Sequence, residues 1–135
     1  VTLLVLSPAQ QAIAPVPQEP AEAPLAASIP IGDTQLRLAV TYLPERQELL
    51  VSASGLTADG VHDHELWLVP QSEDTPLLSL GVIEPGVERR FTLDAAIASE
   101  FADGSALLLS REPLGGKPEG VDAGPVVAEG RMQVI

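Results

Sequence analysis

The chain has 135 residues, which is enough for one domain and a tail. Its 19 acidic and 7 basic residues give a net charge of −12, which disfavours binding to phosphate backbones and so disfavours nucleic acid as a partner. Apolar residues make up 45% and aromatic residues only 3%, so a core must be mainly aliphatic, and the lack of cysteine excludes disulfides and thiolate metal sites.

The first 30 residues differ in composition from the rest. Residues 1–6 are a short apolar run, well below the ~20 residues that a membrane span needs. We interpret this run either as the end of a transmembrane helix or as a strand or frayed end. Six prolines punctuate residues 7–30, where they disfavour helix and favour an extended linker. The sequence therefore predicts a juxtamembrane Pro/Ala-rich stalk over residues 1–30 and a folded domain over residues 31–135; a tail without a spacer role is the alternative.

Short strands follow along the predicted domain. Residues 34–43 and 47–54 are rich in strand-forming residues, and the three residues between them predict a hairpin. Residues 64–69 contain the only tryptophan, Trp67, and are apolar at consecutive positions from Leu66 onward. Such a pattern is typical of a strand buried on both faces, so we expect Trp67 to anchor the core.

The second half of the chain repeats this pattern. Residues 77–83 and 87–93 are predicted strands on either side of a Pro-Gly turn, and residues 94–102 are the one helical candidate, with Asp94 as its cap. Further strands are expected at residues 105–110 and 126–135, with a Gly- and Pro-rich loop at residues 112–125 between them. About seven short strands and at most one short helix predict an all-β fold, an immunoglobulin-like antiparallel β-sandwich.

His62 and His64 are the only histidines, and residues two apart on a strand face the same side. Such a pair could ligate zinc or copper. Only Asp59 and Asp63 lie near enough in sequence to add a ligand, which is fewer than such sites commonly use. We therefore prefer the interpretation that these are surface histidines at the entry of a strand, and we expect no metal or cofactor.

Catalytic patterns are missing from the sequence, which favours a protein that is not an enzyme. There is no Gly-x-Ser-x-Gly elbow, and no convergent set of polar groups is evident. Glu65 and Glu112 could form a carboxylate pair if their strands adjoin. We favour instead that each pairs with an arginine, such as Arg90 or Arg111, or accepts hydrogen bonds from the backbone.

Gly115-Gly116-Lys117 has a superficial similarity to a phosphate-binding loop. In such loops the lysine is followed by serine or threonine and opens a helix, whereas here Pro118 follows within a loop between strands. We interpret the glycines instead as supplying the backbone conformations of a tight reversal.

Four segments in a fixed order carry a family resemblance: residues 65–70 (ELWLVP), 76–81 (PLLSLG), 109–118 (LSREPLGGKP) and 124–130 (GPVVAEG). Their order and spacing resemble the C-terminal domain of the RskA-type anti-sigma factors, the anti-sigma-K factor family. That family has an ELW strand, a Leu-Gly element, a Glu-Pro-x-Gly-Gly-x-Pro loop and a Gly-Pro-Val strand ending in glycine. The resemblance covers the chain from about Leu36 to Gly130.

The resemblance implies an extracytoplasmic regulatory or sensor domain, periplasmic or extracellular, of a single-pass protein of the cell membrane. Its partners would be an extracytoplasmic-function (ECF) sigma factor, bound by a cytoplasmic segment outside this chain, and a site-1-type protease that begins regulated proteolysis. Another extracytoplasmic protein is a further candidate partner. The motif residues are implied to be structural: Trp67, Glu112, Gly115, Gly116 and Pro118. The rival interpretation is an extracytoplasmic ligand- or carbohydrate-binding module that uses the loop at residues 112–125.

Overall fold

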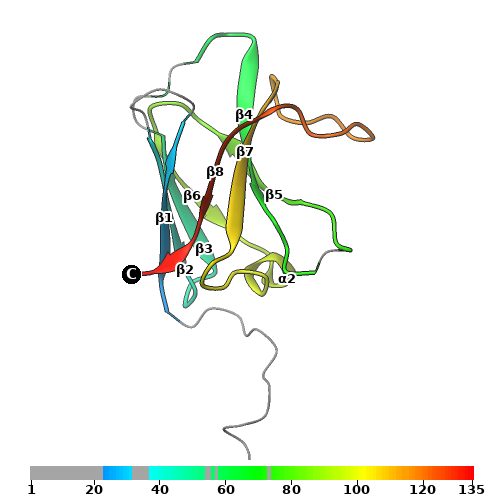
Figure 1. The fold of residues 1–135 in the computed structure, drawn as a ribbon. Coiled ribbons are helices and arrows are strands. Elements are labelled where there is room, and N and C mark those ends of the chain that lie inside the picture. The colour runs from blue at the N-terminus through cyan, green and yellow to red at the C-terminus, as the bar shows by residue number, and fades with distance from the viewer. Residues whose placement is uncertain (1–22, 32–36, 54–55, 57, 73) are drawn as a thin grey trace, which may run out of the picture.

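The computed structural model describes residues 23–31, 37–53, 56, 58–72 and 74–135, which form two antiparallel sheets facing each other (Figure 1). The first sheet has the order β6 (Glu88–Thr92), β3 (Glu48–Ser52), β2 (Arg37–Leu43), β1 (Leu25–Pro30) and β9 (Gln133–Val134). The second has the order β5 (Leu78–Ile83), β4 (His62–Leu68), β7 (Ala106–Pro113) and β8 (Val126–Arg131). A short helix, α2 (Ala95–Ala98), follows β6.

This strand order confirms the predicted all-β, immunoglobulin-like sandwich. Strands β2, β3 and β6 lie as strands A, B and E of that fold, and β5, β4, β7 and β8 lie as C′, C, F and G. These are the seven strands that the sequence predicted. Strand β1 is additional, whereas β9 is the end of the predicted last strand at residues 126–135; both extend the first sheet beyond β2.

Strand β1 corrects the predicted start of the folded domain. It pairs with β2 along its whole length, and Leu25, Ala27 and Ile29 are buried on one face. Pro30 is tolerated because β9 pairs only with the first two residues of β1, so the end of β1 has a free edge there. The domain therefore begins by Leu25 and not at residue 31. The rest of the predicted stalk, residues 1–22, lies outside the described residues.

The apolar core lies between the sheets and is built from alternate residues of the strands, as the low aromatic content predicted. Its largest fully buried side chains include Leu38, Leu49, Leu66, Leu107 and Leu109. At the end of the sandwich next to α2, the rings of Tyr42 and Phe101 stack with their centroids 4.5 Å apart. Burial raises the pKa of the Tyr42 phenol above its ordinary value.

The central strand β4 is buried on both faces, as its consecutive apolar residues predicted. Leu66 and Leu68 belong to the core cluster and are fully buried. Glu65 and Trp67, on the opposite face, are only 7% and 5% exposed. Trp67 is therefore buried, as expected, but its ring lies on the face of β4 opposite the core cluster, because side chains alternate along a strand.

The remaining elements follow the prediction with shifted ends. The turn between β2 and β3 forms the predicted hairpin, and the predicted helix shortens to α2. The last strand bends: β8 lies in the second sheet and β9 in the first. Gly130 permits this crossing, since a Cβ atom there would come within 2.8 Å of Ile29 Cγ1 on β1. In the parts of the chain that the structure describes, no helix is long and apolar enough to span a bilayer.

Candidate functional site

The family-motif residues meet on the outer face of the second sheet, where residues 114–125 connect β7 to β8. We call this segment the β7–β8 loop. It extends from the upper end of the second sheet in Figure 1. Asp63, Glu65 and Trp67 alternate along β4 on this outer face, opposite the core residues Leu66 and Leu68. The loop is therefore built against a polar, partly buried strip of β4 and β7.

Two carboxylates of β4 hold the first half of the β7–β8 loop. The backbone N–H of Gly115 donates to Asp63 Oδ2 at 2.7 Å, and that of Lys117 donates to Glu65 Oε1 at 2.7 Å. Glu65 Oε2 also accepts a hydrogen bond of 2.5 Å from the hydroxyl of Ser79 on β5. Hydrogen bonds to an ionised carboxylate are stronger than neutral ones, so they fix the path of the loop.

A second chain of hydrogen bonds joins Trp67 to the far end of the loop. The indole Nε1–H of Trp67 donates to Ser110 Oγ at 2.8 Å, and the hydroxyl of Ser110 donates to Glu112 Oε2 at 2.5 Å. The same carboxylate oxygen accepts from the backbone N–H of Gly124 at 2.8 Å. Glu112 is only 2% exposed, so its charge is tolerated because these donors satisfy it.

These contacts settle how Glu65 and Glu112 are used. Their strands adjoin, as one alternative required, since β4 pairs with β7 and Glu65 lies opposite Ser110. Each carboxylate accepts backbone and hydroxyl donors, which was the favoured interpretation. Neither pairs with Arg90, whose guanidinium donates to Glu48 at 2.8 Å.

Close approach explains the glycines at two positions of the β7–β8 loop. Gly116 has φ +98°, and a Cβ there would lie 2.9 Å from both Glu65 Oε1 and Val82 Cγ2. At Gly124 a Cβ would overlap the carbonyl oxygen of Arg111. Any side chain at either position would push the loop away from its carboxylate partners.

Lys117 closes the loop on itself. Its Nζ donates to the carbonyl of Val121 at 2.5 Å and to that of Pro118 at 3.1 Å. The ammonium is thus engaged within the loop, and β8 rather than a helix follows the loop. Rejecting a phosphate-binding loop was therefore consistent with the geometry.

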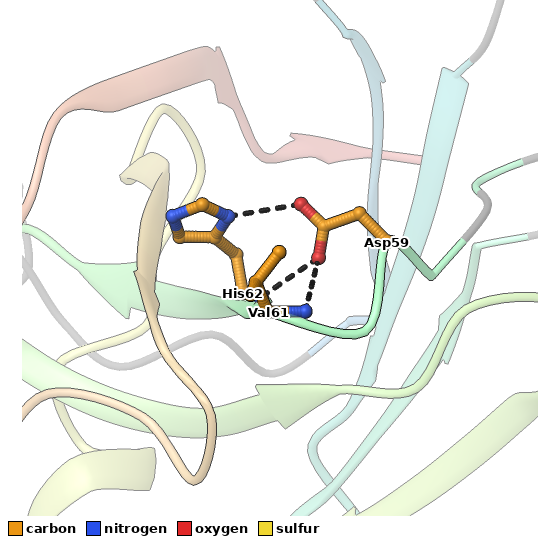
Figure 2. Close-up of polar contacts among 3 residues, drawn as sticks. All are labelled: Asp59, Val61 and His62. Carbon is orange, nitrogen blue, oxygen red and sulfur yellow. Dashed lines mark hydrogen bonds and ion pairs between the residues drawn. The ribbon is translucent and has the colours of Figure 1, made fainter.

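The histidines lie at the entry of β4, at the same end of the sheet as the β7–β8 loop. Figure 2 shows Asp59 holding this entry: Oδ1 accepts from the backbone N–H groups of Val61 and His62 at 2.8 and 2.7 Å, and Oδ2 lies 2.9 Å from Nδ1 of the His62 ring. The contact with the His62 ring is the main cause that holds the pKa of Asp59 well below its usual range, and the two backbone hydrogen bonds add to it. Burial lowers the pKa of His64.

A two-histidine metal site stays a hypothesis. Among the described residues, no group of three or more histidine, aspartate, glutamate or cysteine side chains is arranged to hold a metal ion. His62 faces Asp59, and the cluster formed there is an Asp–His pair that fixes a turn.

A groove of about 410 Å³ lies beside the β7–β8 loop. Its polar lining comes from His62, Arg111, Glu112 and Asp122, and its apolar lining mainly from three prolines and Val121. Pro118, a motif residue, is one of these prolines and is exposed. The loop thus forms one wall of a hollow that opens to solvent.

Sequence reasoning missed Asp63, Ser79, Ser110 and Gly124 as partners in this network. The alternation Asp63-Glu65-Trp67 was a usable signal, since three such residues on one face of a buried strand need partners above them. The identity of those partners depended on the register between β4 and β7, which a single sequence does not give.

The comparisons with known proteins identify the family of the chain. The family model described as anti-sigma-K factor RskA, C-terminal, matches residues 1–126 of the chain. No curated protein and no solved structure matches it. Because the family match covers nearly the whole sequence and includes the β4 and β7 motifs, the chain belongs to the anti-sigma-K factor RskA C-terminal family, whose members are membrane-associated regulatory proteins with a sigma factor as partner.

Proposed function

We propose that this chain is the extracytoplasmic regulatory domain of a membrane-anchored anti-sigma factor, and that it controls release of an ECF sigma factor through regulated proteolysis. The single observation that carries the proposal is the family match over residues 1–126. The sigma factor would be bound by a cytoplasmic segment elsewhere in the protein. This domain would lie on the extracytoplasmic side of the membrane, where it would permit or prevent the first proteolytic cleavage.

The proposed arrangement places the first cut before β1. Residues 1–6 would be the end of the transmembrane helix, and the proline-rich residues after them would be the stalk that a site-1-type protease reaches. The sandwich begins by Leu25, so the proposed stalk would lead directly into the first paired strand. A domain so close to the stalk could shield it or expose it.

We propose no catalytic role for the domain. The acidic side chains that could have served as a catalytic pair, Glu65 and Glu112, accept hydrogen bonds from the chain itself. Their role in this proposal is to hold the β7–β8 loop in one position. The groove beside that loop favours a second function, a ligand- or carbohydrate-binding module, and a sensor domain would combine the two.

A reporter experiment tests the regulatory proposal. The full-length protein is expressed with its sigma factor and a sigma-dependent promoter, either intact, with residues 25–135 deleted, or with Glu65→Ala. We expect both changes to alter basal reporter output, because each removes or loosens the outer domain. Glu45→Ala, in the exposed turn between β2 and β3, is the matched control and should leave output unchanged. Unaltered output and unaltered induction after deletion would contradict a regulatory role.

A further inference from the structure

The groove beside the β7–β8 loop has the size of a small-ligand site. Its volume of about 410 Å³ falls within the range of ~300–1,000 Å³ that is usual for such sites. It lies between the loop and the adjoining ends of β4 and β7, and its walls combine Pro113, Pro118 and Val121 with polar side chains. Apolar walls with a few polar groups are the common composition of a ligand pocket.

Arg111 is the cation of this groove, and its charge is unmatched within the described residues. The chain has seven basic side chains, and five of them have a hydrogen-bond, ion-pair or aromatic partner: Arg37, Arg89, Arg90, Lys117 and Arg131. No ion pair or side-chain hydrogen bond engages Arg111 in the described part of the chain, although it is exposed on a protein of net charge −12. A guanidinium offers a planar pair of donors that matches a carboxylate.

His62 lies on the same groove and is held in position. Its Nδ1 is bonded to Asp59, and Asp59 is in turn fixed by two backbone N–H groups of the same turn (Figure 2). The ring is therefore oriented in advance, and its other nitrogen stays available for a ligand. Asp122 adds an exposed carboxylate to the lining, and a carboxylate accepts hydrogen bonds from hydroxyl groups.

We propose that this groove binds a small hydroxycarboxylate of the uronic-acid type, with Arg111 contacting the carboxylate and His62 and Asp122 contacting the hydroxyl groups. The apolar faces of the prolines lie against the C–H face of the sugar ring. Such a ligand would be the chemical signal that the sensor domain proposed above detects. Only this signalling role rests on the proposed function; binding itself does not. It is tested on the purified 135-residue chain without sigma factor or protease, so its failure and the failure of the reporter experiment are distinguishable.

The test is an NMR titration of the purified chain with D-glucuronate. A ligand of this size at ordinary ligand efficiency gives a Kd of about 1 mM, and we expect saturable shifts in amide signals of the β7–β8 loop and the entry of β4. D-glucose, which lacks the carboxylate, should bind at least ~10-fold more weakly, and acetate should also bind more weakly, because it lacks the hydroxyl groups. A galacturonate trimer distinguishes a polymer end from a free sugar acid. The trimer reproduces the monosaccharide shifts only if the groove accepts the end of a sugar-acid chain.

Three variants locate the binding. Arg111→Ala should weaken glucuronate binding at least ~10-fold, and Arg111→Lys should weaken it less, because the charge stays and the two-pronged donor is lost. Arg46→Ala is the matched control: this arginine is also exposed but lies in the turn between β2 and β3, at the opposite end of the sandwich (Figure 1). Unchanged binding in Arg46→Ala supports the proposal. Absence of saturation at ~20 mM, equal binding of glucose, or unchanged binding in Arg111→Ala would each overturn it.

Discussion

Replacing Glu65 by alanine is the sharpest test of how the β7–β8 loop is held. The Glu65 carboxylate accepts a hydrogen bond from the Ser79 hydroxyl at 2.5 Å and another from the Lys117 backbone N–H at 2.7 Å. It is 7% exposed, so water does not readily replace either bond while the loop is closed. Alanine removes both acceptors and leaves two donors in a poorly hydrated place.

The expected loss of stability follows from these two bonds. A hydrogen bond to a charged group contributes about 1.5–3 kcal/mol to stability, so two of them give an upper limit of about 6 kcal/mol. In the variant the loop can move away from β4 and expose both donors to water, and the new hydrogen bonds to water recover part of the lost stability. We therefore expect Glu65→Ala to lower the free energy of unfolding by about 2–4 kcal/mol.

Urea unfolding followed by tryptophan fluorescence measures this change directly, because Trp67 is the only tryptophan and lies on the same face of β4. Amide hydrogen exchange separates local from global effects: exchange at Lys117 should quicken more than exchange at Gly124, which is held by Glu112. Glu45→Ala, in an exposed turn, is the control and should change stability by less than ~0.5 kcal/mol. A loss below ~1 kcal/mol in Glu65→Ala, or no change in exchange at Lys117, would refute this account of the loop.

Three further changes test the surrounding structure. Trp67→Ala should lower the free energy of unfolding by about 3–5 kcal/mol, measured by circular dichroism in urea, because it removes a large buried ring and the indole donor to the Ser110 hydroxyl. A loss below ~1 kcal/mol would show that the ring is not a packing anchor. Gly116→Ala should destabilise the fold more than Gly120→Ala, because both residues have positive φ but only Gly116 has neighbours within 4 Å of a new Cβ; equal costs would contradict the close approach to Glu65. The Asp59 carboxyl should stay ionised below its ordinary pKa of 3.8 in the folded chain and titrate normally in urea, as followed by carboxyl carbon NMR. Since the folded-state pKa is the lower one, the stabilisation of the turn is complete above the unfolded pKa and is lost as pH falls through the folded pKa, and an unshifted titration would remove the Asp59–His62 contact from the account.

Local patterns explain why so much of the sandwich could be predicted. The hairpin of β2 and β3 depends on a short turn between two apolar runs, and both signals lie within about 20 residues of sequence. The burial of β4 on both faces was visible in its consecutive apolar residues. Strand β1 was missed because prolines bracket it, although prolines at the end of a partly free edge do not interrupt pairing.

The candidate site depended on contacts between distant parts of the chain. Lys117 donates to Glu65 across 52 residues of sequence, and Trp67 donates to Ser110 across 43. Such pairs follow from the register of β4 on β7, which places Ser110 opposite Glu65. The sequence therefore indicated which residues belong to the motif, while the face on which Trp67 lies and the partners of each carboxylate required the structure.

The mass of the fragment released outside the cell tests the central claim most directly. Cells expressing the full-length protein with a C-terminal tag are induced, and the shed or membrane-proximal C-terminal fragment is purified and its first residue determined by mass spectrometry. Regulated proteolysis that begins in the stalk predicts a fragment starting before Leu25, with β1 to β9 intact, and its appearance together with the rise in sigma-dependent transcription. A first cut within residues 25–135, or a full transcriptional response with no such fragment, would contradict the account.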